Sequence, residues 1–537
     1  MWHQVYAPIA GSLALSALVA AIPVFALLLA LGALHYPAWK ASVLGLAAAM
    51  VVALFAYGMP AALLVSSVAY GAAFGLFPIG WIVFAAIVLY RVTVETGKFE
   101  IIKDSVGGLT GDKRLQALLI AFAFGAFIEG ASGFGTPVAV AAAMLTGLGF
   151  SPFYAAGICL LANTAPVAFG AIGIPVITLA GLTNLPLRDL SANVGRICAP
   201  VSLFIPAYLV NVIGGWKAVR AVFPGVAVCG IAFAGIQFVV SNYFGPYLTD
   251  ILASLAAMVS LVVVLSVWKP RDHQEQTAAA APARHAINEV LWAWMPYALL
   301  VVFVSLWGLG AVKQWLDIAS RNLPWPALHN QIVRMPPAVA KPLPYGAMYN
   351  VNLLSAAGTS CFFAAICSAV LLKMSLRQFA RLLVSTARQL FLPLLTIAVV
   401  LGLAYVMNYS GATATLGLAF AATGALFPFF SALLGWLGVF LTGSDTSANA
   451  LFGNLQVVTA TSLHLNPALM AAANSSGGVM GKMISLQSIA VAAAATGMPA
   501  SDEAKLFRFT LRHSMLLATV IGLVVVFYAY VMPGWVR

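Results

Sequence analysis

The sequence predicts an all-α polytopic membrane protein with about twelve transmembrane helices, two re-entrant hairpins and an inverted-topology repeat. Three observations lead to this fold class. Of the 537 residues, 62% are apolar and only 7% are Asp, Glu, Lys or Arg, whereas roughly a quarter of an ordinary soluble domain is charged. Apolar runs of the roughly 20 residues needed to cross a lipid bilayer recur along the whole chain. Polar strings also interrupt apolar segments at corresponding places in two halves of the chain.

Apolar runs bounded by charge or by Pro and Gly clusters mark the expected spans. The first run is too long for the apolar part of a signal peptide and lacks a basic start, so we expect it to be retained. Two further apolar segments, 116–148 and 430–455, are broken at the centre by Gly-rich polar strings and predict hairpins or broken helices. Residues 269–289 and 311–350 are polar and predict loops. The expected spans are 8–34, 41–58, 79–95, 152–183, 197–213, 221–240, 251–268, 290–310, 351–372, 393–411, 466–495 and 514–533.

An internal duplication organises the chain. FGAFIEG (124–130) and LGVFLTG (437–443) share a Gly, a Phe and a second Gly at equivalent positions. A nearly constant offset aligns other pairs, including NTAPVAFG (163–170) with NSSGGVMG (474–481). The predicted organisation is N-terminal helices at 1–58, repeat one at 59–183, connecting helices and loops at 184–373, repeat two at 374–499 and a C-terminal helix at 500–537.

The basic residues predict how the two copies are oriented. Repeat one has no Lys or Arg between 60 and 77 but five between 91 and 114, whereas repeat two has four between 373 and 388 and none between 412 and 430. Because Lys and Arg in short loops favour the cytoplasmic side, equivalent segments should lie on opposite faces of the membrane. Inverted repeats of this kind are typical of secondary transporters. Both termini are then expected outside the cytoplasm, although this places the basic residues of 311–350 on the disfavoured side.

Four polar strings are the candidates for a transport site: EGASGFGTP (129–137), NTAPVAFG (163–170), GSDTSAN (443–449) and NSSGGVMG (474–481). Irregular backbone at membrane depth is tolerated only where protein buries it or where it lines a cavity. Glycine permits such a break, and the exposed N-terminus of a half-helix offers N–H donors and partial positive charge to an anion. The alternative is that these small residues serve close helix packing.

Two carboxylic acids and one lysine lie within these apolar segments. Glu129 and Asp445 are expensive in hydrocarbon, and burial favours the protonated form of a carboxylic acid, so we expect them to couple transport to protons. A buried salt bridge is the alternative. Lys482 is expected to pair with a substrate carboxylate or with Asp445, unless it extends to the membrane surface. Arg91 and Glu95, four residues apart near a helix end, predict an interfacial ion pair or a functional pair. No histidine lies where it could relay protons within the membrane.

The composition also excludes several classes. The net charge of +12 comes from Lys and Arg residues spread over short connections, so no nucleic-acid partner is expected. The five cysteines lie in apolar stretches without CxxC spacing, so neither a disulfide framework nor a metal site is expected, and no cofactor is implied. An intramembrane enzyme with Asp445 as base is disfavoured because no histidine, metal-ligand cluster or soluble catalytic domain accompanies it. We therefore predict no catalytic residues.

The polar strings and their flanks resemble the bacterial L-lactate permease family, within a broader ion-transporter superfamily. The resemblance lies in FGAFIEGASGFGTPVAVAAAML, YAAGICLLANTAPVAFGAIGIPV, LGWLGVFLTGSDTSANALFGNLQ and AANSSGGVMGKMISLQSIA. It covers nearly the whole chain, and FLTGSDTSANALF is its most specific part. It implies uptake of L-lactate, and often of D-lactate and glycolate, with protons across the bacterial inner membrane.

We expect the substrate near the bilayer midplane, where the tips of both hairpins meet the two Asn-containing strings. The sequence does not decide which of Glu129 and Asp445 carries the proton, and it selects no oligomeric state. A sodium-coupled carrier of di- or other hydroxycarboxylates from the same superfamily is the alternative function. The expected substrate-binding residues are Ser132, Gly133, Thr136, Asn163, Thr164, Ser444, Thr446, Asn474, Ser475 and Lys482.

Overall fold

A computed structural model describes residues 1–133, 135–270, 283 and 285–536. Within these residues, twelve helices are long and apolar enough to cross a membrane, or thirteen if a pair bent by 64°, Pro152–Ala162 and Val167–Thr183, forms one span. The chain is therefore a mostly helical, polytopic membrane protein, as predicted. Most of the predicted loop at 269–289 lies outside the described residues.

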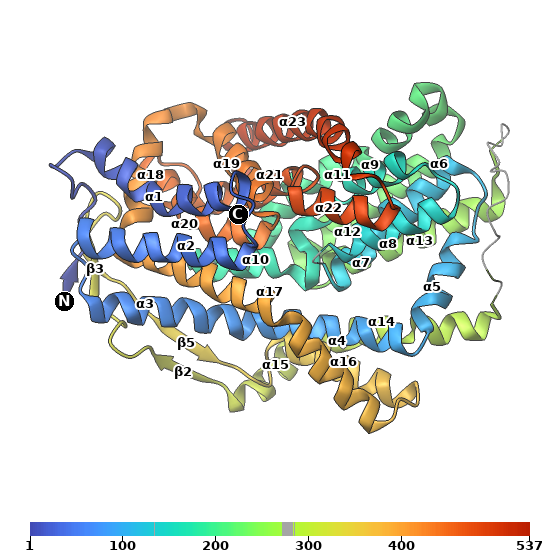
Figure 1. The fold of residues 1–537 in the computed structure, drawn as a ribbon, viewed down its shortest axis with the longest axis horizontal. Helices are drawn as coiled ribbons and strands as arrows, with labels where there is room; N and C mark the ends of the chain where they lie inside the picture. The colour runs from blue at the N-terminus through green and yellow to red at the C-terminus, as the bar shows by residue number, and fades with distance from the viewer. Residues whose placement is uncertain (134, 271–282, 284, 537) are drawn as a thin grey trace.

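The helices follow one another with short connections in the first half of the chain (Figure 1). They are α1 (Leu13–Gly32), α2 (Ala38–Val51), α3 (Ala61–Phe74), α4 (Trp81–Glu95), α5 (Lys98–Gly107), α6 (Lys113–Gln116), α7 (Gly125–Ala131), α8 (Thr136–Gly147), α9 (Pro152–Ala162), α10 (Gly170–Thr183), α11 (Leu187–Ala221), α12 (Phe223–Tyr243) and α13 (Thr249–Val267).

The second half continues in the same manner. Its helices are α14 (Ile287–Gly308), α15 (Gly310–Leu316), α16 (Ala357–Leu371), α17 (Leu376–Ser410), α18 (Ala412–Phe420), α19 (Phe427–Thr442), α20 (Asp445–Ser462), α21 (Pro467–Lys482), α22 (Leu486–Thr496) and α23 (Ala500–Tyr530). Short π or 3₁₀ turns are η1 (Val52–Ala56), η2 (Gly75–Gly80), η3 (Ala117–Phe124), η4 (Val167–Phe169), η5 (Asp317–Ala319), η6 (Ala421–Leu426) and η7 (Pro533–Trp535).

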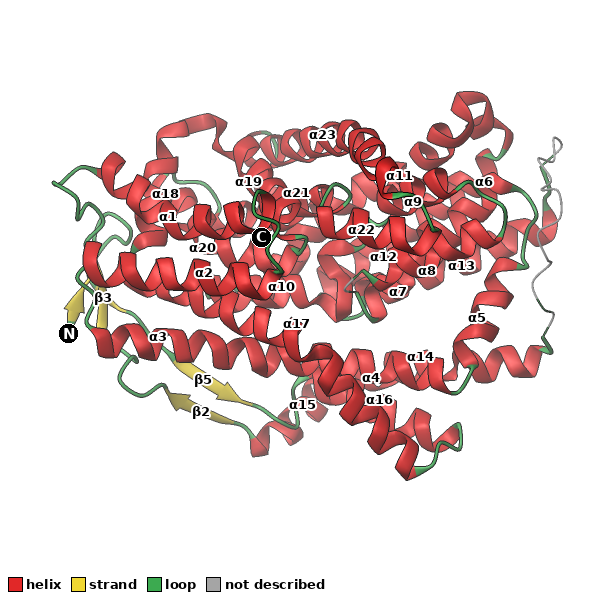
Figure 2. Cartoon of the chain, in the orientation of Figure 1, coloured by secondary structure: helices red, strands yellow, loops and turns green. Residues whose placement is uncertain are grey.

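Residues 311–350 are not simply a loop, and the fold is not purely α-helical. After α15, strand β2 (Arg321–Pro324) pairs antiparallel with β5 (Met348–Val351), while β3 (Ile332–Arg334) pairs with both β1 (Trp2–His3) and β4 (Leu343–Pro344). The strands lie at one edge of the molecule (Figure 2). These short pairings form hydrogen bonds to backbone groups that lie outside any helix. The sequence of this segment lacks the alternation of apolar and polar residues that would have predicted strands. The N-terminus lies on the same side as this segment because β1 pairs with β3.

The predicted third span, 79–95, is too short. Helical structure runs from Ala61 to Glu95 as α3, η2 and α4, with a local interruption at Phe77 (φ −143°, ψ 123°). Gly71 and Gly75, in the part of this run that the prediction left out, are packing residues. A Cβ at Gly71 would lie 2.5 Å from the carbonyl oxygen of Leu401, so glycine brings α3 directly against α17.

Both predicted hairpins consist of two helices separated by a break, and the helices of each pack against each other. In the first, η3 and α7 end at Ala131 and α8 begins at Thr136. In the second, α19 ends at Thr442 and α20 begins at Asp445. Gly443, with φ +71°, makes the second break in a left-handed conformation that favours glycine.

The two Asn-containing strings behave differently. Residues 163–170 break the chain between α9 and α10 as predicted, and Ala171 and Ile172 then adopt positive φ. Residues 474–481 do not break it, because they are continuous α-helix within α21. The prediction of a second broken string is therefore wrong, and its glycines serve packing. A Cβ at Gly477 would lie 2.0 Å from the carbonyl oxygen of Ala432 on α19.

The helices form two groups that meet near the centre of the molecule. In one, α3 packs on α17 and α16 packs on α4 and α14; in the other, α19 packs on α21 and α23, and α12 packs on α11 and α13. Figure 1 shows α3, α4, α14 and α16 on one side and α23 on the opposite side. Helices α10 and α20, which pack on each other, lie between these sides.

The two proposed copies share an order of elements, a 35-residue helical run (61–95 and 376–410) followed by a hairpin and a helix pair. Duplication and opposite orientation stay predictions.

Candidate functional site

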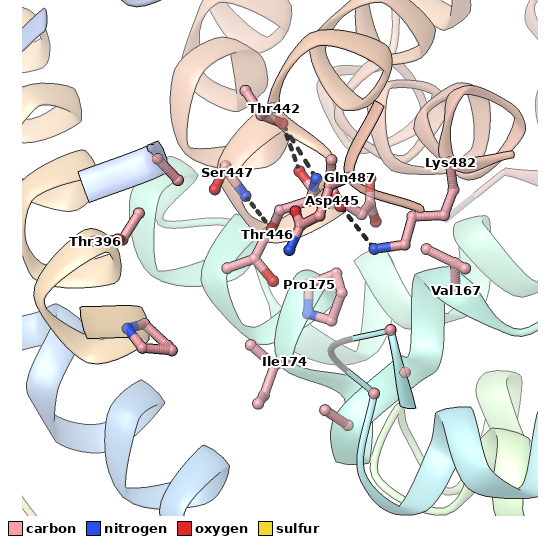
Figure 3. Close-up of a pocket in the computed structure, with 18 of the residues that line it drawn as sticks. Val167, Ile174, Pro175, Thr396, Thr442, Asp445, Thr446, Ser447, Lys482 and Gln487 are labelled. Carbon is pink, nitrogen blue, oxygen red and sulfur yellow. Dashed lines mark hydrogen bonds between the residues drawn. The ribbon is translucent and has the colours of Figure 1, made fainter. Parts of the chain in front are cut away.

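A cavity of about 370 Å³ lies where the two hairpins meet the chain break before α10 (Figure 3). Its wall includes both acidic residues singled out by the sequence, Glu129 and Asp445, together with Lys482. Helices α2 and α17 close another side. The lining residues are Ala38, Trp39, Glu129, Gly133, Gly135, Val167, Gly170, Ala171, Ile174, Pro175, Leu392, Pro393, Thr396, Ile397, Thr442, Gly443, Ser444, Asp445, Thr446, Ser447, Lys482, Gln487, Ser488 and Val491.

The N-terminal ends of four helices border this cavity. Gly135 precedes α8, Ile174 begins the right-handed part of α10 after the positive-φ residues 171–173, Asp445 begins α20, and Gln487 lies in the first turn of α22. The first N–H groups of a helix have no partner inside it, and the helix dipole adds partial positive charge there. Four such ends around one cavity make it suited to a small anion.

The start of α20 shows this arrangement in detail. The Ser444 hydroxyl accepts a hydrogen bond from the N–H of Ser447 (3.3 Å), and the Thr442 hydroxyl donates to the Ser444 carbonyl (3.1 Å). These bonds fix the turn that leads into α20. Among the described residues, the N–H groups of Asp445 and Thr446 have no hydrogen-bond partner. They are available to a ligand carboxylate.

Asp445 is held from one side only. Its side chain is 3% exposed, and its Oδ2 accepts hydrogen bonds from Ser475 Oγ (2.6 Å) and Asn449 Nδ2 (3.5 Å). Its Oδ1 has no partner among the described residues. A Cβ at Gly478 would lie 2.4 Å from that oxygen, so this glycine makes room for the carboxyl. The structure forms no salt bridge to Asp445 within the described residues.

Glu129 lies near the end of α7 and lines the same cavity as the α20 terminus. It is 5% exposed, and its Oε2 has no hydrogen-bond partner in the described part of the chain. A Cβ at Gly170 would lie 2.5 Å from Glu129 Oε1. Each cavity carboxyl therefore lies against a glycine of an Asn-containing string, and each has at least one oxygen without a hydrogen-bond partner that could hold a proton.

Lys482 is the last residue of α21 and contributes the cavity's positive charge. Its Nζ donates to the carbonyl oxygen of Gly443 at 2.6 Å, which ties it to the break of the second hairpin (Figure 3). Its charge acts on both Glu129 and Asp445, although neither forms an ion pair with it in the described structure. The structure thus places Lys482 in the cavity wall.

The structure separates the expected substrate-binding residues into two sets. Gly133, Ser444, Thr446 and Lys482 line the cavity. The others, Ser132, Thr136, Asn163, Thr164, Asn474 and Ser475, are outside its lining.

Several residues of the second set have structural partners instead. Ser132 and Thr164 donate to carbonyls of their own chain segments. The Asn474 side chain donates to Asn449 (2.9 Å) and accepts from Gln456 (3.0 Å). Together with Ser475, Asn474 therefore supports Asp445 and the start of α20 from behind.

Sequence reasoning missed several residues of this site. Gln487 and Ser488 follow Lys482 by five and six residues and could have been found by extending the fourth polar string past Lys482. Trp39 on α2 and Thr396 on α17 carry no such signal, because only tertiary packing brings them to the cavity.

The predicted pair Arg91 and Glu95 forms an ion pair at 2.9 Å, and neither residue lines the cavity. No cluster of His, Cys, Asp and Glu in the described residues could hold a metal ion.

Comparison with known proteins identifies similar chains. The family model described as L-lactate permease matches residues 16–532. The chain is 45% identical over 555 residues to the L-lactate permease of Bacillus subtilis (strain 168), covering 97% of each protein. It is 44% identical over 555 residues to the glycolate permease GlcA of Escherichia coli (strain K12), covering 99% of each. Among solved structures, Neisseria gonorrhoeae MtrF matches with a TM-score of 0.46 and 14% identity, over 88% of this chain and 84% of MtrF. That likeness is too low to bear on the site.

Proposed function

This chain belongs to the L-lactate permease family, and we propose that it takes up L-lactate, and also D-lactate and glycolate, by proton symport across the bacterial inner membrane. Relatives named as L-lactate and glycolate permeases support this substrate class. Both substrates are small carboxylates with a hydroxyl group on the adjacent carbon. The protein is a multi-pass membrane transporter, and the proposal concerns its substrate, coupling ion and membrane.

The observation that carries the proposal is the cavity bordered by four helix N-termini and Lys482. The free N–H groups of Asp445 and Thr446 would bind the substrate carboxylate, with Lys482 as its counter-charge. The hydroxyls of Ser444, Thr446 and Ser447 offer partners for the substrate hydroxyl. The apolar wall formed by Val167, Ile174 and Val491 would contact the methyl group of lactate.

Glu129 and Asp445 suit the coupling of this anion to protons. A buried carboxylate without an ion-pair partner is costly, and a proton removes that cost. Each acid retains one oxygen without a partner in the described structure. A proton taken up on either acid would offset the negative charge of lactate as the loaded site changes the side to which it opens.

The position of the cavity also suits alternating access. Its walls come from both helix groups, since α2 and α17 face the hairpin helices across it. Movement of one group against the other would therefore change the route into the cavity while leaving the α20 terminus and Lys482 together.

The test is radiolabelled L-lactate uptake into proteoliposomes, with the proton and sodium gradients imposed separately. The proposal predicts accumulation under an inward proton gradient with no dependence on sodium. Glu129→Gln and Asp445→Asn are compared in the same assay. The variant that lacks the proton-carrying acid should no longer accumulate lactate but should still exchange it. Accumulation that follows sodium alone would instead support the sodium-coupled carrier.

A further inference from the structure

Asn449 links two helices whose first turns border the cavity. It is the fifth residue of α20, it is 0% exposed, and in the described chain it is outside the cavity lining. Its Nδ2 donates to the carbonyl oxygen of Pro175 on α10 (3.2 Å) and, at the longer distance of 3.5 Å, to Asp445 Oδ2. Its Oδ1 accepts from Asn474 Nδ2 on α21 (2.9 Å). One buried amide therefore joins α10, α20 and α21.

The partner of Asn449 on α10 belongs to the cavity wall. Pro175, labelled in Figure 3, lines the cavity and directly follows Ile174, where the right-handed part of α10 begins. Asp445 begins α20, one turn before Asn449. The hydrogen bond between Asn449 and Pro175 spans 274 residues of the chain. It therefore ties the first turn of α10 to the start of α20, which are two of the four helix ends around the cavity.

Close packing continues this contact away from the cavity. Gly453 lies one turn after Asn449 on α20, and a Cβ at Gly453 would lie 2.5 Å from Cδ1 of Leu179, one turn after Pro175 on α10. The two helices thus remain in contact over successive turns. The amide hydrogen bond of Asn449 lies at the end of this interface nearest the cavity, where no glycine contact holds the helices together.

Two further amides fix the orientation of Asn449. Gln456 Nε2 donates to Asn474 Oδ1 (3.0 Å) and to the carbonyl oxygen of Ser431 on α19 (3.0 Å). Because Asn474 accepts through its oxygen, its Nδ2 donates to Asn449 Oδ1, and Asn449 Nδ2 is directed to Pro175. Gln456, Asn474 and Asn449 are all 0% exposed. A buried amide group without a partner is costly, so this network holds Asn449 in the orientation that bonds α10.

We propose that Asn449 is a positioning residue for the anion site, which sets the separation between the N-terminal ends of α10 and α20. It acts through Pro175 and the start of α20 and does not contact the substrate. The favourable effect of a helix N-terminus on an anion falls off within the first turn, so the two ends act on one carboxylate only while they are held together. The inference rests on the proposed function, which supplies that carboxylate.

The test is L-lactate counterflow in proteoliposomes, with KM and the maximal rate measured separately for wild type and Asn449→Leu. Leucine keeps the branched shape of asparagine but cannot donate or accept a hydrogen bond. Loss of the link to α10 should raise KM by roughly tenfold. The maximal rate should stay within about threefold of wild type, because Glu129, Asp445 and Lys482 are unchanged and the lost contribution is to binding.

The matched control is Thr459→Val on the same helix. The buried Thr459 hydroxyl donates to the carbonyl oxygen of Gly417 on α18 (2.9 Å), a helix that contributes none of the described lining residues. Both variants lose a buried hydrogen bond between helices, so both should have a lower melting temperature in detergent than wild type. Only Asn449→Leu should have a raised KM.

A wild-type KM in Asn449→Leu, or an equal rise of KM in Thr459→Val, would overturn the proposal, because the amide would then serve stability alone. If Asn449→Leu does not assemble, Asn449→Ala decides the question, since it removes the same hydrogen bonds without adding bulk. A raised KM in that variant would support the positioning role and an unchanged KM would refute it. Wild-type protein without lactate counterflow would instead refute the proposed function and this inference with it.

Discussion

Replacement of Lys482 by glutamine tests the proposed role of the cavity's positive charge. The substitution removes the charge but keeps a side chain that can still donate to the Gly443 carbonyl, which Lys482 Nζ contacts at 2.6 Å. The glutamine amide is one bond shorter than the lysine side chain, so the melting temperature of the variant is measured alongside binding to check that the link between α21 and the second hairpin holds. The loss should appear in substrate binding rather than in folding.

The expected size follows from the type of contact. A hydrogen bond to a charged group contributes about 1.5–3 kcal/mol, which corresponds to roughly 10- to 150-fold in affinity. Lys482→Gln should therefore raise the dissociation constant for L-lactate by a factor in this range. The measurement is equilibrium binding of radiolabelled L-lactate to purified protein in detergent.

The matched control is Lys505→Gln on α23. The Lys505 side chain is 70% exposed and pairs with Asp502 at 2.8 Å, so the loss of its charge should leave lactate affinity within about twofold. If Lys482→Gln bound lactate as tightly as wild type and the control, Lys482 would not contact the substrate, and the carboxylate would have to be bound by backbone N–H groups alone.

Two further predictions concern stability. Gly477→Ala should destabilise the protein by about 1–3 kcal/mol, because its Cβ would lie 2.0 Å from the Ala432 carbonyl oxygen and force α19 and α21 apart. The control Gly235→Ala, with nothing within 4 Å of the new Cβ, should be neutral or stabilising. Equal melting temperatures for the two variants in detergent would contradict this prediction. In the segment outside the membrane, the hydroxyl of Ser355 donates to Asp317 and holds the pKa of that carboxyl below its ordinary value. A lowered pKa stabilises the fold above the ordinary value and loses this effect as pH falls through the folded value, so the melting temperature of Ser355→Ala should lie below that of wild type at pH 7, and the difference should shrink as pH falls below the ordinary pKa of an Asp carboxyl. A difference that persists at the lower pH would show that this bond does not act through the ionised Asp317.

The acidic residues and hairpin breaks could be predicted because their signals are local. A carboxyl within an apolar segment is costly in every tertiary context, so Glu129 and Asp445 stand out from their immediate neighbours. A left-handed turn needs glycine, and Gly443 supplies it at the predicted break. Glu129, Asp445 and Gly443 all line the cavity.

The features that were missed depend on distant residues. Glycine and serine are common both at chain breaks and at close helix contacts, so residues 474–481 alone do not distinguish the two. The structure shows that they pack against α19. Asp250 is in the first turn of α13, where an acid ordinarily faces water, but its side chain is fully buried and Gly130 of α7 packs against its Cβ. The contributions of Trp39 and Thr396 arise from helices that are remote in sequence from both hairpins.

A structure determined with L-lactate bound tests the central claim most directly. The account predicts substrate density within the 370 Å³ cavity, with the lactate carboxylate at the backbone N–H groups of Asp445 and Thr446 and within hydrogen-bond distance of Lys482. Lactate bound elsewhere, with this cavity empty, would contradict the assignment of the site.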